Sequence, residues 1–172
     1  KRLVRVLVNA GIDALGMSGV DRGMIRADKM RFAAYLDMDM GFTGVVTSVR
    51  AEVVRDYLNA RWTPVIAPIC MGATTNYNVN ADHVAGAVAG SIGAERLIFL
   101  SNVLGVLDKN KTLIPALNAT QTASLIADGT IFGGMIPKVR VALEALERGA
   151  QTVVIGNLDT LATGVGTTFT QE

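Results

Sequence analysis

Two amide side chains and a carboxylate crowd one short stretch of the sequence, Asn78–Asp82, which reads NVNAD. The stretch follows the apolar run 65–69 and leads into the small residues 85–93, so it is expected to join a strand to a helix. Ligands of α/β proteins are held at such junctions. Asp82 therefore has two interpretations. It is a carboxylate in the first turn of a helix capped by Asn80, or an acid that orders other groups around a bound anion.

A lysine follows a pair of glycines later in the chain. Gly133 and Gly134 come just before Met135, and Pro137 and Lys138 fall in the expected first turn of a helix. A lysine at that end opposes the helix dipole, whereas a bound phosphate would accept from the backbone N–H groups and pair with the ammonium. Lys138 is thus either a solvated surface lysine or part of a phosphate site.

A loop that begins with Ser101 and Asn102 follows the apolar run 96–100 and continues through Gly105 and Val106. The end of a buried strand lies at the ligand-bearing edge of a parallel sheet, so this loop is in position to hold a nucleotide. Its composition is equally that of an ordinary turn, and the loop alone does not decide between the two interpretations.

The histidine and cysteine content excludes other kinds of site. His83 is the only histidine and Cys70 the only cysteine, so the sequence has neither an internal disulfide nor the cluster typical of a protein-held metal. No Walker or Rossmann glycine signature is present. A single cysteine, expected to be a small buried residue, fits a reducing, cytoplasmic location.

The composition predicts one domain with a large apolar core. Half of the 172 residues are apolar and only 18% are charged, which leaves apolar surface to cover and predicts a homo-oligomer. The net charge is +1 and no basic stripe is interleaved with aromatic residues, so no nucleic acid is expected as a partner. No apolar run is long enough to span a bilayer, so no membrane is expected either.

Hydrophobic periodicity predicts alternating helices and strands. Expected helices cover residues 2–9, 50–59 with Ser48 as its cap, 80–92, the stretch from the Thr120 cap to 127, and 135–148. Expected strands cover residues 12–17, 24–27, 42–46, 65–69, 96–101, 152–156 and 164–170, with short strands or a hairpin at 30–40. This order predicts an α/β protein, a three-layer α/β/α sandwich with a mostly parallel central sheet.

Three motifs share the order and spacing found in a known family: NVNAD at 78–82, LSNVLGVL at 100–107 and GGMIPKV at 133–139. The closing GTT at 166–168 and the early stretches GMSGVDRGMIRA at 16–27 and DMGFTG at 39–44 fit the same pattern. The chain therefore resembles the amino acid kinase family nearly from end to end, and within it the acetylglutamate kinases.

The resemblance implies the amino acid kinase fold and ATP-dependent phosphorylation of the side-chain carboxylate of N-acetyl-L-glutamate, which gives an acyl phosphate in arginine biosynthesis. Residues 1–172 would form a single kinase domain, with about 1–75 in its amino-acid-binding half and about 76–172 in its nucleotide-binding half. Mg²⁺ would bind through the nucleotide phosphates, with no metal ligand from the protein. The expected oligomer is a dimer or a hexamer.

The resemblance also implies roles for single residues. Asp82 would organise the catalytic lysines, and Lys138 would stabilise the transferring phosphoryl group, which suits a reaction that depends on positioning and charge. Asn78 and Asn80 would lie at the acylated amino acid. The nucleotide would lie against residues of the two later motifs: Ser101, Asn102, Gly105, Val106, Gly134, Met135 and Lys138.

The sequence departs from the family pattern in three places. The family's Lys-x-Gly-Gly strand, glycine-rich loop and substrate-gripping arginine are not in it, so we expect an N-terminally incomplete domain with little activity from these residues alone. Asn102 stands where acetylglutamate kinases commonly have Asp, and the stretch 155–166 is short. Two alternatives follow: a kinase for N-acylated or carrier-bound 2-aminoadipate in lysine biosynthesis, for which Asn102 fits better, and a non-catalytic nucleotide-binding fragment.

Overall fold

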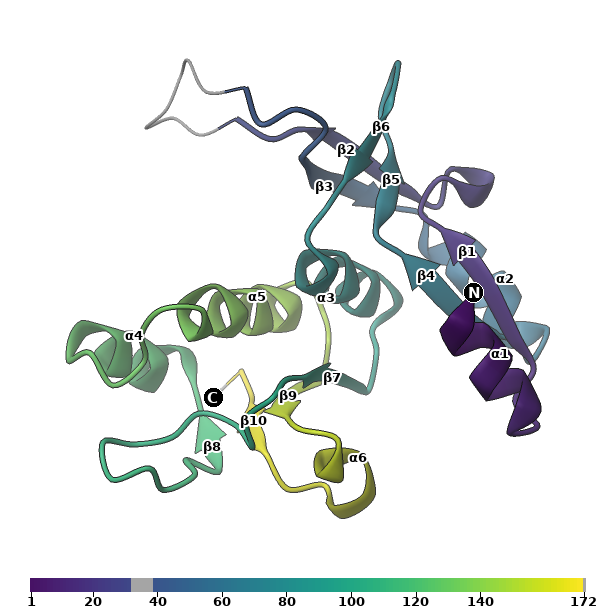
Figure 1. Cartoon of the computed structure of the whole chain (residues 1–172). Helices are drawn as coiled ribbons and strands as arrows, with labels where there is room; N and C mark the ends of the chain where they lie inside the picture. Colours follow the sequence, from purple (N-terminus) through teal and green to yellow (C-terminus); the bar gives the residue numbers. More distant parts are fainter. Residues whose placement is uncertain (32–38, 172) are drawn as a thin grey trace. The chain divides into compact units, whose positions relative to one another are not determined.

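The computed structural model describes residues 1–31 and 39–171. Two compact units make up the chain, unit 1 (Lys1–Val88) and unit 2 (Ala89–Glu172) (Figure 1). The boundary falls inside helix α3 (Ala81–Ile92). Most of the segment 30–40, where short strands or a hairpin are expected, lies outside the described residues.

Unit 1 contains two sheets. Strands β1 (Ala14–Ser18) and β4 (Thr63–Ala67) form a parallel pair. The second sheet has four strands in the order β3 (Gly44–Val49), β2 (Ile25–Lys29), β5 (Ile69–Met71) and β6 (Asn76–Asn78). The outer pairs of this sheet are antiparallel and the central pair, β2 with β5, is parallel.

Pro68 separates β4 from β5, so the single strand expected at 65–69 is wrong at its end. Proline has no N–H to donate to a ladder, and strands therefore rarely continue through it. The chain leaves the parallel pair at Pro68 and enters the four-stranded sheet at Ile69.

The helices of unit 1 lie close to their expected positions. Helix α1 (Arg2–Asn9) has the predicted bounds, and Gly11 follows it with φ +83°, a conformation that favours glycine. Helix α2 (Ala51–Asn59) does not have the predicted Ser48 cap. Ser48 lies inside β3, where it pairs with Arg26, because the strand continues to the residue before the helix cap.

The core of unit 1 gathers side chains from β2, α2 and β5. Met24, Ile25, Val53 and Cys70 have no exposed surface. Burial raises the pKa of the Cys70 thiol to about 11, so the thiol stays protonated at neutral pH and Cys70 packs as a small apolar side chain, as predicted. On α2, Val53 and Val54 are buried, whereas Leu58 is exposed.

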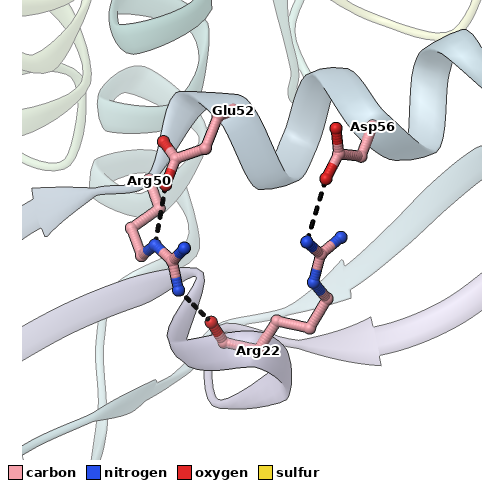
Figure 2. Close-up of polar contacts among 4 residues, drawn as sticks. All are labelled: Arg22, Arg50, Glu52 and Asp56. Carbon is pink, nitrogen blue, oxygen red and sulfur yellow. Dashed lines mark hydrogen bonds and ion pairs between the residues drawn. The ribbon is translucent and has the colours of Figure 1, made fainter.

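A network of charged side chains joins the short 3₁₀ turn η1 (Asp21–Gly23) to α2 (Figure 2). Arg22 pairs with Asp56, with 2.9 Å between Nη2 and Oδ2, and Arg50 pairs with Glu52, with 2.8 Å between Nε and Oε1. Arg50 Nη1 also donates to the Arg22 carbonyl oxygen at 2.9 Å. Exposed ion pairs add little stability singly, but this network fixes the turn after β1 against the start of α2.

Unit 2 is built on one mixed sheet of four strands, in the order β7 (Arg96–Leu100), β9 (Thr152–Gly156), β10 (Thr167–Phe169) and β8 (Ala116–Leu117). Strands β7 and β9 are parallel, and β10 runs antiparallel to β9 and parallel to β8. The predicted strand 152–156 has the observed bounds of β9.

Helix α5 (Met135–Glu147) packs against β9, and its inner face carries the buried side chains Val139, Val141, Ala142, Ala145 and Leu146. Helix α4 (Ala119–Ala127) begins with a capping box, in which the Asn118 side chain accepts from the Gln121 N–H at 2.9 Å. The predicted Thr120 cap is therefore wrong, because Asn118 and Gln121 have the reciprocal spacing that such a box requires. Helix α6 (Asp159–Thr163) has no predicted counterpart.

The described elements confirm the α/β class. Each unit has helices packed with sheets, and parallel pairs occur in both units. The described strands are divided among three sheets, and the antiparallel pairs β2–β3, β5–β6 and β9–β10 make the pairing mixed.

Candidate functional site

The NVNAD stretch lies in unit 1 and forms the turn between β6 and α3. Its backbone is anchored on two sides, because the Asn78 N–H donates to the Phe42 carbonyl at 2.8 Å and the Val79 N–H donates to the Pro68 carbonyl at 2.9 Å. Val79 is 3% exposed, whereas Asn78 is exposed. The turn is thus held by its backbone and its single buried valine, and the Asn78 side chain is left at the surface.

Asn80 caps helix α3. Its Oδ1 accepts from the Asp82 N–H at 2.9 Å, which satisfies one of the N–H groups left over at a helix start. Asp82 is half-buried in the first turn, where the helix dipole favours a carboxylate. The capping interpretation of Asn80 is confirmed, and it leaves the Asp82 carboxylate out of the cap itself.

Tyr77 sits between two glycines just before this turn. A Cβ on Gly44 would come within 2.5 Å of Tyr77 Cβ and 3.1 Å of the Asp28 carbonyl oxygen. A Cβ on Gly72 would come within 2.5 Å of Tyr77 Cε2 and of the Thr75 carbonyl oxygen. Because both glycines make room for one ring, the position of β6, and with it that of Asn78, depends on their lack of side chains.

The Ser101–Val106 loop of unit 2 is anchored at both ends. The Ser101 N–H donates to the Gly156 carbonyl at 2.7 Å, which continues the β7–β9 ladder by one residue. At the other end, the Val106 N–H donates to Thr167 Oγ1 at 2.8 Å. Gly105 and Val106 are buried, whereas Asn102 is exposed.

The start of α5 has no side-chain cap and has space around its glycines. Gly133 has φ +55° and Gly134 stands at the N-cap position, where no side chain caps the helix. A Cβ added at either glycine would meet nothing within 4 Å. The first turn satisfies its own backbone donors, because the Met135 and Ile136 N–H groups donate to the Phe132 and Gly133 carbonyls at 3.2 Å and Pro137 has no N–H.

Lys138 lies one turn into α5 and is half-buried. Its ammonium lies 5.5 Å from the centre of the Phe99 ring, close enough for a cation–π interaction. Phe99 belongs to β7 and is 3% exposed. Lys138 is therefore not the fully solvated surface lysine that its local sequence allows.

The topology of unit 2 places the loop after β7 and the start of α5 toward one edge of the sheet. β7 and β9 are parallel, with Leu100 opposite Gly156, so both strands end at the same edge. α5 leads into the beginning of β9, so its own beginning, with Gly134 and Met135, lies toward the edge where β7 and β9 end. Ser101 and Asn102, which follow β7, and the start of α5 therefore lie toward the same edge of the sheet, and Lys138 lies over Phe99 of β7.

A cavity of about 390 Å³ lies in unit 1 at the ends of β1 and β4, lined in part by Lys1, Gly16, Ser18 and Asp21. The Ser18 N–H and Oγ donate to Asp21 Oδ2 at 2.7 and 2.9 Å, and these hydrogen bonds lower the pKa of the Asp21 carboxyl below its usual value. The sequence prediction did not single out Asp21. The Ser-x-x-Asp spacing just after a strand was the available signal.

No group of three or more His, Cys, Asp or Glu side chains is placed to hold a metal ion among residues 1–31 and 39–171. The helices of the same described residues include none that is long and apolar enough to cross a membrane.

Comparison with known proteins identifies the family. The profile of the amino acid kinase family matches residues 1–157. The chain is 50% identical over 172 residues to an acetylglutamate kinase of Chloroflexus aurantiacus, covering 99% of this chain and 66% of that protein. It is 51% identical over 158 residues to an acetylglutamate kinase of Roseiflexus castenholzii, covering 92% of this chain and 60% of that protein.

A solved structure is also similar. The crystal structure of smu.665 from Streptococcus mutans UA159 superposes with a TM-score of 0.82 at 31% identity, covering 98% of this chain and 65% of that one. The chain thus spans less than two thirds of the length of each of these three proteins. The profile match covers far more than half of the sequence, and the chain belongs to the amino acid kinase family.

Proposed function

We propose that this chain is part of an acetylglutamate kinase, which transfers the terminal phosphoryl group of ATP to the side-chain carboxylate of N-acetyl-L-glutamate. The observation that carries this proposal is the 50% identity over 172 residues with a protein of that name. The arrangement in unit 2 supports it, because the uncapped start of α5 lies toward the edge where two parallel strands end, and the Lys138 ammonium lies over Phe99 of one of these strands.

Lys138 supplies the positive charge of the reaction. The transferring phosphoryl group carries negative charge on its equatorial oxygens, and a fixed ammonium stabilises that charge where it develops. Packing over Phe99 holds the Lys138 side chain in place before a ligand arrives. Asp82 organises the catalytic lysines from the first turn of α3.

Asn78 and Asn80 bind the acylated amino acid. The Asn80 Oδ1 is engaged in the helix cap, so its Nδ2 is the group that donates to an oxygen of the substrate. Asn78 presents an exposed amide at the end of a strand whose backbone is anchored. Amide donors fix the orientation of a carboxylate or acetyl oxygen without adding charge.

The nucleotide binds against Ser101, Asn102, Gly105 and Val106 on one side and against Gly134, Met135 and Lys138 on the other. The dipole of α5 and the Lys138 ammonium favour a phosphate at this helix start, where no side chain caps the helix. Mg²⁺ is held through the nucleotide phosphates, where it neutralises part of their charge.

The domain organisation, location and oligomeric state follow from the same proposal. Residues 1–172 form one kinase domain, with about 1–75 on the amino-acid side and about 76–172 on the nucleotide side. The protein is a cytoplasmic homo-oligomer, a dimer or a hexamer. Exposed apolar residues on α1 support an oligomer, since Leu3, Val6 and Val8 are each more than half exposed.

Acyl phosphate formation tests the proposal. Protein containing these residues is incubated with MgATP and N-acetyl-L-glutamate, and hydroxylamine traps the product as a hydroxamate. We expect hydroxamate from N-acetyl-L-glutamate in excess of that from N-acetyl-2-aminoadipate. A preference for the aminoadipate substrate would reassign the acceptor, and nucleotide binding without any hydroxamate would support a non-catalytic nucleotide-binding chain.

A further inference from the structure

Thr167, the first residue of β10, has no exposed surface, yet its side chain is polar. Its Oγ1 accepts from the Val106 N–H at 2.8 Å and donates to the Ile114 carbonyl oxygen at 2.7 Å. A buried hydroxyl with two such partners satisfies both its donor and its acceptor capacity. The hydroxyl is therefore a specific connection between β10 and the segment that follows the Ser101–Val106 loop.

Val106 and Ile114, the two partners of the Thr167 hydroxyl, are also joined to each other directly. The Ile114 N–H donates to the Val106 carbonyl at 2.9 Å. In a hydrogen-bonded pair of antiparallel segments, the two opposed residues exchange both N–H···O bonds. Here one bond is direct, and the Thr167 hydroxyl bridges the other by standing between the Val106 N–H and the Ile114 carbonyl.

Gly105 shows how closely the loop approaches β10. A Cβ at this position would lie 2.6 Å from Thr167 Oγ1 and 2.9 Å from the Thr167 backbone nitrogen. The backbone of the loop therefore rests directly on Thr167, and the opposite end of the loop is held by the Ser101 N–H on the Gly156 carbonyl. Residues 102–105 span the distance between these two anchors.

We propose that Thr167 is a positioning residue for the nucleotide-binding loop, whose hydroxyl sets the backbone conformation at Gly105 and Val106. The proposal rests on the proposed function, in which this loop contacts the nucleotide. Thr167 itself, being fully buried, does not contact the ligand. Removing the hydroxyl would leave the Val106 N–H and the Ile114 carbonyl without their partner, and the loop would have to move to satisfy them.

Replacement by valine and by serine separates the hydroxyl from the shape of the side chain. Thr167→Val keeps the volume and removes both hydrogen bonds, whereas Thr167→Ser keeps the hydroxyl. The matched control is Thr122→Val, because Thr122 is also fully buried in unit 2 and its Oγ1 donates to the Asn118 carbonyl at 2.7 Å, within α4. The control makes the same chemical change away from the loop.

The measurements are the dissociation constant of MgAMP-PNP by calorimetry and the hydrogen-exchange rate of the Val106 amide in nucleotide-free protein. We expect Thr167→Val to weaken nucleotide binding roughly tenfold, as the loss of a buried hydrogen bond predicts, and to speed exchange at Val106. Thr167→Ser should bind within about threefold of the wild type, and Thr122→Val should bind like the wild type while lowering the unfolding temperature.

Equal affinities of the wild type and Thr167→Val would overturn the proposal, as would equal weakening by Thr167→Val and Thr122→Val. If Thr167→Val does not fold, Gly105→Ala carries the test, because its added methyl displaces the loop while the hydroxyl remains. Unchanged nucleotide affinity in Gly105→Ala then overturns the proposal. A wild-type protein that binds no nucleotide overturns the proposed function. The positioning role is then judged by exchange alone: faster exchange of the Val106 amide in Thr167→Val than in the wild type supports it, and equal exchange overturns it.

Discussion

The Lys138 ammonium lies over the ring of Phe99, 5.5 Å from its centre. Phe99 is buried in β7, so a core side chain determines where this charge is held. A lysine positioned in this way loses less conformational freedom when a phosphate binds than a freely moving one would.

Replacing Lys138 with methionine should lower the turnover rate by roughly 100-fold or more, because the charge is needed most in the transition state. Nucleotide affinity should change much less. Steady-state kinetics and calorimetry on the same protein provide the two values. Arg140→Met, an exposed charge on the same helix, is the matched control and should leave both near wild type. Losses of the same size in turnover and affinity would mean that Lys138 serves only in binding.

Asp82→Asn and Asn80→Ala should differ in their effect on stability. Asp82→Asn keeps the backbone N–H that donates to Asn80 Oδ1, so turnover should collapse while thermal unfolding changes little. Asn80→Ala removes the cap and should lower the unfolding free energy by about 1 kcal/mol. Kinetics and differential scanning calorimetry test both variants. An active Asp82→Asn protein would return Asp82 to a purely helix-terminal role.

Gly44→Ala should destabilise unit 1. The added methyl would approach Tyr77 Cβ to 2.5 Å and the Asp28 carbonyl oxygen to 3.1 Å, and neither atom belongs to a flexible side-chain end. Overpacking of this kind typically costs about 1–3 kcal/mol in unfolding free energy. Gly134→Ala, which meets nothing within 4 Å and has φ −66°, is the control for stability. Urea unfolding measures both, and equal midpoints would contradict the close packing on Tyr77.

The Asp21 carboxyl should make stability depend on pH. Hydrogen bonds from the Ser18 N–H and Oγ lower the folded-state pKa of Asp21 below its ordinary value of 3.8. A lowered pKa stabilises the folded protein above the ordinary value, and the contribution is lost as the pH falls through the folded pKa. Asp21→Asn should therefore be less stable than wild type at pH 7, and the difference should shrink in strong acid. Urea unfolding at both pH values measures it, and a difference independent of pH would contradict the assignment.

Elements with strong local signals could be predicted from the sequence. Helix α1 and strand β9 have their predicted bounds because each combines a clear apolar pattern with a glycine near its end. The caps were harder to predict. Ser48 and Thr120 have suitable side chains, but the extension of β3 and the Asn118–Gln121 box decide where the helices begin.

Contacts at the candidate site could be predicted where they depend on neighbouring residues, as for the Asn80 cap of α3. They could not be predicted where they join distant residues. Nothing local in the sequence indicates that Phe99 lies under Lys138 or that Thr167 bridges Val106 and Ile114. The five residues of α6 are too few for a periodic pattern.

The hydrogen bond between Val106 and Thr167 joins residues 61 positions apart. A nascent chain that has emerged from the ribosome only as far as α6 already contains the whole Ser101–Val106 loop but not the hydroxyl that anchors it. Contacts between distant residues form late in folding because long loops must close first. We therefore expect the loop to acquire its final shape only once β10 has joined the sheet, so that during refolding a protease should cut residues 102–105 until then.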